Sequence, residues 1–256
     1  WMDYMFSAPA NYWAIDGPGN DGDYCWFGEH RTPGSIAITG GADTPPDWYP
    51  PEAALQGAGV MTETVTNAYL LCRIADTIED DLSIPPGRKD ALLAAFVEVV
   101  DGRAPAGPFA ESCAAQLGAA VLPAERELVA NTRRVVALTH GFEAAQRAAI
   151  QRCVRIMSEG MARFARRRST DGLSDVPEMN DYCYVVAGCV GEMLTDLFAA
   201  YSAGIARRHA DLFPMARSFG QGLQMTNILK DIWEDRAAGA CWLPRSVFDA
   251  YGIDLS

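Results

Sequence analysis

Two acidic clusters of the same form, D-x-x-E-D, lie inside stretches that otherwise have the apolar pattern of helices. The first cluster is Asp76–Asp80 and the second is Asp231–Asp235. On a helix, positions i and i+4 share one face, so the two aspartates of each cluster point the same way. Like charges at that spacing repel each other, and burying them would cost far more. The chain must therefore fold so that something positive offsets this repulsion.

A divalent cation is the partner that these side chains favour. Hard carboxylate oxygens suit Mg²⁺, which is usually held by one or two carboxylates together with substrate phosphates. A single cluster could equally be the solvated end of a helix. Two copies, each flanked by apolar and basic residues, favour a site. The predicted metal ligands are the paired aspartates of both clusters, Asp76, Asp80, Asp231 and Asp235.

The rest of the chain predicts an all-α fold. From Pro51 onward, helical periodicity is interrupted only by proline and glycine, and no segment alternates in the manner of a strand. We expect one domain over residues 51–256, a bundle of many helices. The expected helices cover residues 52–81, 88–100, 108–117, 123–138, 144–168, 177–203 and 210–236. Residues 1–50, which hold four of the six tryptophans and many turn residues, are expected to be an irregular segment packed on the body.

Composition excludes several classes of function. The net charge of −12 argues against a nucleic-acid partner, because phosphate backbones need basic surfaces. The seven cysteines are an odd number without a C-x-x-C pair, so we expect buried thiols in a reducing compartment. We see no secretory signal. No stretch approaches a membrane span, because Glu98 and Glu192 interrupt the longest apolar runs.

Two further segments allow more than one interpretation. In Tyr182–Gly191, Gly188 and Gly191 lie inside a predicted helix, where each glycine costs roughly 1 kcal/mol relative to alanine. The space they leave suits a neighbouring helix as well as a ligand. The three arginines Arg166–Arg168 complement the dipole at a helix C-terminus in the simplest interpretation.

Taken together, these segments carry a resemblance to a known family. Tyr69–Asp81 resembles the first aspartate-rich motif of squalene synthases, Tyr182–Gly188 resembles their Y-C-x-Y-V-A-G segment, and Gln221–Arg236 resembles their second aspartate-rich motif. Gly160–Phe164 and Cys241–Pro244 match further short segments. The chain is thus similar to the squalene/phytoene synthase family from about residue 51 to 248, and the E-D form of both motifs is typical of the squalene branch.

The resemblance implies an isoprenoid synthase bundle with a central cavity and a specific reaction. Two farnesyl diphosphates would condense head to head (1′-1) to presqualene diphosphate, with Mg²⁺ bridging the aspartates to the diphosphate, and NADPH would then reduce this intermediate to squalene. NADPH rests on the resemblance alone, because the chain has no G-x-G-x-x-G fingerprint. The oily product implies a cytoplasmic protein in peripheral contact with the inner membrane face.

The same resemblance assigns roles to individual residues. Tyr182 is expected to assist the first half-reaction. Arg73 lies on the helical face of Asp76 and is placed to grip diphosphate oxygens. Glu79 and Glu234 are expected to support the metal. The cavity-facing residues that would contact substrate, phosphate or cofactor are Tyr69, Gln224 and Asn227.

Two departures from the family keep other functions open. The family's N-terminal Ser-Arg-Ser-Phe-like segment has its nearest match at residues 33–37, which lack the arginine, so that only Arg31 could stand in for it. The family's C-terminal helices are expected to be missing after Ser256. The alternatives are a dehydrosqualene- or phytoene-type synthase without reduction, and a catalytically silent relative that acts as a binding or assembly protein.

Overall fold

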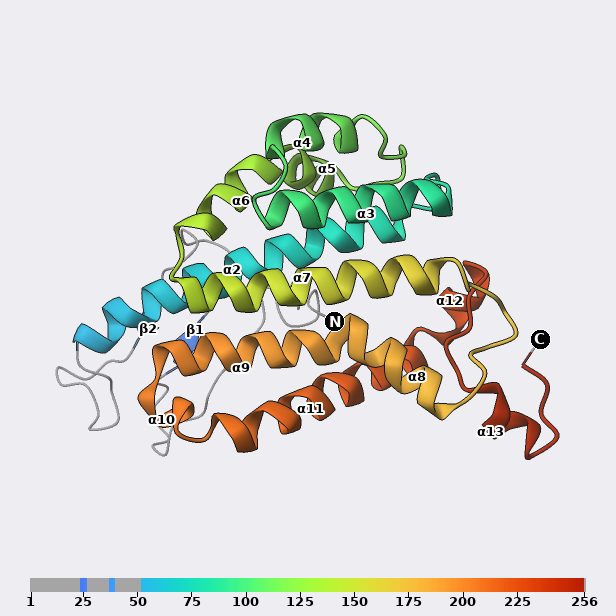
Figure 1. The fold of residues 1–256 in the computed structure, drawn as a ribbon. Helices are drawn as coiled ribbons and strands as arrows, with labels where there is room; N and C mark the ends of the chain where they lie inside the picture. The colour runs from blue at the N-terminus through green and yellow to red at the C-terminus, as the bar shows by residue number, and fades with distance from the viewer. Residues whose placement is uncertain (1–23, 27–36, 40–51, 256) are drawn as a thin grey trace. The chain divides into compact units, whose positions relative to one another are not determined.

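The computed structural model describes residues 24–26, 37–39 and 52–255, and nearly all of the described chain is helical (Figure 1). The first helices are α2 (Glu52–Asp80), α3 (Pro86–Val100), α4 (Ala106–Ala114), α5 (Pro123–Ala130) and α6 (Thr132–Gly141). They are followed by α7 (Ala144–Ala165), α8 (Val176–Cys183), the π-helix η1 (Tyr184–Gly188) and α9 (Cys189–Tyr201). The last are α10 (Ala203–Ala206), α11 (His209–Lys230), α12 (Ile232–Ala237) and α13 (Arg245–Asp249). The prediction of an all-α fold is confirmed.

Two short strands lie before residue 51, outside the region for which an all-α domain was predicted. The short strands β1 (Tyr24–Trp26) and β2 (Ala37–Thr39) pair antiparallel, with Tyr24 opposite Thr39. Each strand has three residues, which is too short for an alternating pattern to appear in the sequence. The packing predicted for the irregular N-terminal segment and the position of Arg31 lie outside the described residues.

The compact unit that contains the candidate site comprises Asn67–Ser256, whereas the first turns of α2 belong to the preceding unit, Trp1–Thr66. Within the larger unit, α7 lies between α3 and α9, and α11 packs on the other side of α9 (Figure 1). Large apolar side chains make up much of the core of this unit. Among the fully buried ones are Leu71, Ile74 and Ile78 of α2, Phe96 of α3, Ile150 and Met157 of α7, and Met193 and Leu197 of α9. The domain boundary at residue 51 stays a prediction.

Helix ends explain where the sequence pattern was misleading. The expected helix over residues 123–138 is two helices, α5 and α6, because the chain leaves the helical conformation at Asn131. The expected helix over residues 210–236 is also two helices, which meet at Asp231. Helix α7 ends at Ala165, three residues before the predicted end at Arg168. When only one residue leaves the helical conformation, the apolar residues on both sides keep their helical spacing. The spacing of apolar residues alone therefore does not locate such a break.

The predicted burial of the cysteines as free thiols is confirmed in the described helical body. Cys72, Cys113, Cys153, Cys183 and Cys189 are free thiols buried among apolar side chains, as is Cys241. Small apolar thiols of this kind pack in the manner of other small hydrophobic residues.

The expectation that no stretch approaches a membrane span needs correction. Residues 176–201 form one helical stretch that is long and apolar enough to cross a membrane by length and composition alone. Glu192 does not interrupt it, because the hydropathy of the surrounding residues outweighs one charge. Of its most apolar window, 61% is buried inside the protein, as in the core helix of a globular protein. No other described helix meets these criteria.

The glycines of η1 and α9 serve a close helix crossing. A Cβ atom on Gly191 would lie 2.2 Å from the carbonyl oxygen of Ala216 on α11. A Cβ on Gly220 of α11 would lie 2.4 Å from the carbonyl oxygen of Ala187 on η1. Both distances are far below van der Waals contact with rigid backbone. The space left by small residues in this segment is therefore filled by a neighbouring helix.

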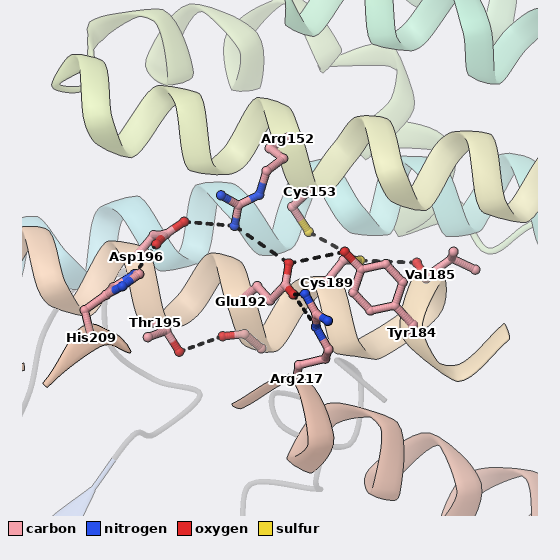
Figure 2. Close-up of polar contacts among 11 residues, drawn as sticks. Arg152, Cys153, Tyr184, Val185, Cys189, Glu192, Thr195, Asp196, His209 and Arg217 are labelled. Carbon is pink, nitrogen blue, oxygen red and sulfur yellow. Dashed lines mark hydrogen bonds and ion pairs between the residues drawn. The ribbon is translucent and has the colours of Figure 1, made fainter. Parts of the chain in front are cut away.

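A network of charged residues joins helices α7, α9 and α11 (Figure 2). Glu192 of α9, only 2% exposed, accepts a hydrogen bond of 2.5 Å from Nε of Arg217 on α11 and one of 3.3 Å from the hydroxyl of Tyr184. Asp196, one turn further along α9, pairs with Arg152 of α7 at 2.9 Å and with His209 of α11 at 2.6 Å. Glu192 pairs with Arg217 and Asp196 pairs with Arg152, and for the buried Glu192 this removes the cost of an unpaired buried charge.

Candidate functional site

The first acidic motif occupies the last turns of α2. Asp76 keeps 23% of its side-chain surface exposed, Glu79 is partly buried, and Asp80 is exposed at the final residue of the helix. Apolar neighbours on the other faces of the same turns, Ile74 and Ile78, are fully buried. The carboxylates therefore project from the one face of α2 that the core leaves open.

Asp81, the next acidic residue, has a separate structural task. Its carboxylate accepts hydrogen bonds from Ser83 N (2.9 Å), Ser83 Oγ (2.7 Å) and Gly118 N (2.6 Å), and the residue is 7% exposed. Burial by itself would raise the pKa of Asp81, but the hydrogen bonds from Gly118 and Ser83 outweigh it and lower the pKa. Asp81 therefore ends α2 and ties it to the loop after α4.

We expect Asp81→Asn to lower the free energy of unfolding by about 1–3 kcal/mol, because a buried network loses a charged acceptor. The folded-state pKa is below the unfolded value of 3.8, so the carboxylate stabilises the protein above about pH 4. That contribution disappears as the pH falls through the folded-state pKa. Urea unfolding at pH 6 and at pH 3 measures both effects. Asp80→Asn is the matched control, and equal stability of the two variants at pH 6 would contradict this role.

The second acidic motif lies at a helix junction and not within one helix. Asp231 ends α11 and precedes α12, with φ −99° and ψ 13°, and its side chain is 3.3 Å from Nζ of Lys230. The backbone nitrogen of Asp235 still donates to the carbonyl oxygen of Asp231 at 2.9 Å. One helical turn therefore continues across the break. Asp235 is partly buried, whereas Glu234 is exposed to solvent.

The fold brings the two motifs into electrostatic reach of each other. Burial and the charge of Asp231 raise the pKa of Asp235, and Asp80 of the first motif adds to that rise. The pKa of Tyr182 on α8 is raised well above its usual value, first by burial and then by the charges of Glu79 and Asp235. Carboxylates from both motifs therefore lie within electrostatic reach of Tyr182, although they are 155 positions apart in the chain (235 − 80).

The carboxylates carry more negative charge than their surroundings balance. Burial and the charge of Asp80 raise the pKa of Asp76 from 3.8 to about 8, although Arg73 opposes the shift. Burial and Asp80 likewise raise the pKa of Glu79 to about 7. Both groups therefore hold protons near neutral pH until a cation takes the place of those protons.

Two cations beside the first motif are already engaged. Arg73 donates a hydrogen bond to Glu125 of α5, and its other terminal nitrogen is 3.8 Å from Asp76. Lys89 of α3, which is 5% exposed, donates to the carbonyl oxygen of Glu79. The sequence analysis did not identify Glu125 or Lys89. The Pro85-Pro86-Gly87 turn after α2 was the available sign that α3 folds back toward the first motif.

Aromatic side chains enclose Tyr182. Trp242 stacks on its ring with centroids 4.3 Å apart and an interplanar angle of 9°. Phe164 of α7 meets the same ring edge-on at 5.1 Å. Because burial keeps the pKa of Tyr182 far above neutrality, its phenol is protonated.

The remaining predicted residues lie on helices that lead to the motifs. Tyr69 is partly buried on α2, two turns before Asp76. Gln224 of α11 is buried at 9% exposure, and Asn227 is partly buried one turn before Asp231. The carbonyl oxygen of Asn227 accepts the backbone N–H of Asp231, so these residues and the second motif share one helix face.

The donor set suits Mg²⁺ but is not a closed metal cage. Across the described part of the chain, no three His, Cys, Asp or Glu side chains converge closely enough to hold a metal ion by themselves. The raised pKa values of Asp76 and Glu79 nevertheless indicate an unmet demand for positive charge. Open carboxylate pairs fit an ion that completes its coordination with water and substrate phosphates.

The stacked helices, together with acidic motifs at the ends of two of them, define a protein of the isoprenoid synthase fold. Residues 53–256 match the family model for squalene/phytoene synthase. The chain belongs to the squalene/phytoene synthase family.

Individual relatives agree with this assignment. A squalene synthase of Ganoderma lucidum is 32% identical over 199 residues, covering 76% of this chain and 40% of the relative. A squalene synthase of Candida albicans is 29% identical over 204 residues, covering 76% and 42%. The solved structure of TcSQS in complex with a ligand is 28% identical, with a TM-score of 0.59, and covers 78% of this chain and 57% of that one. The chain thus spans about two fifths of the length of these curated relatives.

Proposed function

We propose that this protein condenses two farnesyl diphosphates head to head (1′-1) to presqualene diphosphate and then reduces this intermediate to squalene with NADPH. The observation that supports the proposal most is the approach of the two acidic motifs around Tyr182. Asp80 and Asp235 act on each other electrostatically, and both act on the Tyr182 phenol. A diphosphate with its counter-ions would fit between such carboxylates.

The carboxylates would hold the leaving group through metal. Mg²⁺ bound there would neutralise the charge that develops on the departing diphosphate. Asp76 and Asp80 on α2, with Asp231 and Asp235 at the α11–α12 junction, are the proposed ligands, and the neighbouring Glu79 and Glu234 would add negative charge. Gln224, Asn227 and Tyr69 would contact the substrate along the same helix faces.

Arg73 and Tyr182 would act on the reacting groups. Arg73 could bind diphosphate oxygens in bidentate fashion, but it would have to exchange its hydrogen bond to Glu125 for one to the substrate. The neutral phenol of Tyr182 can donate to the diphosphate oxygen and relay the proton that leaves when the cyclopropane closes. The stacked rings of Trp242 and Phe164 would keep water from the carbocation.

The reductive stage has the least support from the residues themselves. The chain has no dinucleotide fingerprint, and no described residue points to a nicotinamide site, so we derive no step through NADPH. A synthase that stops before reduction, of the dehydrosqualene or phytoene type, is the alternative within the family. We further infer peripheral contact with the inner face of a membrane, because the product would be an apolar hydrocarbon.

Product analysis tests the proposal directly. The purified chain is incubated with farnesyl diphosphate and Mg²⁺, with and without NADPH, and the products are identified by mass spectrometry. We expect presqualene diphosphate without NADPH and squalene with it. An unchanged product when NADPH is added would contradict the reductive stage. Coupling of only a longer prenyl diphosphate would favour the phytoene type, and no coupling of any prenyl diphosphate would favour a silent binding protein.

A further inference from the structure

The three consecutive arginines after α7 have three different environments. Arg166 pairs with Asp90 of α3, and Arg167 pairs with Glu178 of α8. Arg168 follows the last turn of α7 and is partly buried, unlike the exposed Arg166 and Arg167. Arg166 and Arg167 therefore bind side chains of neighbouring helices in addition to any interaction with the helix dipole, and these ion pairs do not involve Arg168.

Backbone hydrogen bonds fix the position of Arg168 next to the second acidic motif. The carbonyl oxygen of the following residue, Ser169, accepts the N–H of Cys241 at 2.8 Å. The residue before Cys241, Ala240, donates its N–H to the carbonyl oxygen of Asp235 at 2.8 Å. Ala240 and Cys241 thus connect the main chain of Ser169, the neighbour of Arg168, to that of Asp235. The loop after α7 is held further by Leu173, whose N–H donates to Leu243 O at 2.9 Å.

The Arg168 guanidinium lies within electrostatic range of both motifs. Its charge lowers the pKa of Glu79 in the first motif and of Asp235 in the second, in each case after larger effects that raise these pKa values. Its Nε–H is nevertheless buried and has no hydrogen-bond partner within the described chain. A buried donor without a partner is rare in folded proteins and calls for an explanation. The other cations of the region, Arg73 and Lys89, already donate to protein groups.

We propose that Arg168 is a diphosphate-binding residue that the loop after α7 contributes between the two acidic motifs. The guanidinium presents donors in a planar fork that matches two phosphate oxygens, and its unused Nε–H would complete that fork. A diphosphate held between Asp80 and Asp235 through metal would offer this donor an acceptor. The inference rests on the proposed function, since it deepens the recognition of a prenyl diphosphate by that same site.

Calorimetric titration with two probes, Mg²⁺ alone and inorganic pyrophosphate in saturating Mg²⁺, tests the assignment. We expect Arg168→Gln to bind pyrophosphate about 10- to 100-fold more weakly, as the loss of charge-assisted hydrogen bonds requires. It should bind Mg²⁺ at least as tightly as the unmodified protein, because a positive charge beside Glu79 and Asp235 is removed. Arg168→Lys should recover part of the loss, because lysine keeps the charge without the fork.

Arg167→Gln is the matched control, because it removes the same group one residue earlier, from a pair outside the motifs. It should leave both titrations unchanged. Unaltered pyrophosphate binding in Arg168→Gln would overturn the proposal. So would a parallel loss of Mg²⁺ and pyrophosphate binding with a lower melting temperature, since that pattern defines a purely structural residue.

The binding assay separates this inference from the function on which it rests. If Arg168 governs pyrophosphate affinity but the protein couples no farnesyl diphosphate, the proposed reaction fails and the residue assignment stands. If the protein forms squalene or presqualene diphosphate, and Arg168→Gln keeps the affinity of the unmodified protein, the residue assignment alone fails.

Discussion

Asp76→Asn is expected to lower kcat for farnesyl diphosphate by about a thousandfold, because it removes a ligand of the metal that stabilises the leaving diphosphate. The same change should leave the metal-free protein equally stable or more stable. The pKa of Asp76 is raised from 3.8 to about 8 in the folded state, so ionisation of this group opposes folding. In the unmodified protein, the free energy of unfolding contributed by this group falls as the pH rises from about 4 to about 8. The asparagine variant lacks that decrease.

Three measurements test this prediction. They are the turnover rate, urea unfolding of the metal-free protein, and the shift of the melting temperature on adding Mg²⁺. The Mg²⁺-induced shift should shrink in Asp76→Asn and in Asp231→Asn. Asp81→Asn provides the contrast, because it should lose stability and retain turnover where it is folded. An Asp76→Asn variant with full activity would exclude the metal assignment.

Gly220→Ala is expected to lower the free energy of unfolding by about 3 kcal/mol or more, because helices α11 and η1 would have to separate. The new Cβ would lie 2.4 Å from the carbonyl oxygen of Ala187 and 2.9 Å from its carbonyl carbon, and neither atom is at the end of a flexible side chain. Since α11 carries the second acidic motif, the separation should also weaken binding of inorganic pyrophosphate with Mg²⁺.

Gly222→Ala, on the same helix, is the control for this prediction. Gly222 is exposed and has nothing within 4 Å of an added Cβ, so alanine should raise the free energy of unfolding by about 0.5–1 kcal/mol through helix propensity. Chemical denaturation of both variants decides the matter. If the two alanine variants change stability in the same direction, Gly220 is not required for the close crossing of α11 and η1.

Local patterns in the sequence predicted the parts of the fold that depend on local physics. The expected helix over residues 52–81 matches α2 almost to the residue, because its apolar period continues until Asp80 and a turn follows at Pro85-Pro86. The break at Asp231 was not predicted. The backbone N–H of Asp235 still donates to the carbonyl oxygen of Asp231, so one helical turn continues across the break and the side chains keep a helical spacing. The roles of acidic neighbours also could not be separated in sequence. Asp80 and Asp81 are adjacent. Asp80 is exposed at the site, whereas Asp81 is buried and accepts hydrogen bonds from Ser83 and Gly118.

The sequence by itself determined that this protein is helical and that it carries two copies of an acidic motif, because helical period and i, i+4 spacing are properties of neighbouring residues. Only the tertiary structure decided which groups meet at those motifs. The fold brings Arg168, in the loop after α7, within electrostatic reach of Glu79 and Asp235, and it places Glu125 of α5 on Arg73. Such contacts join residues that are distant in the chain, and they depend on how side chains of several helices interlock, which no single segment encodes.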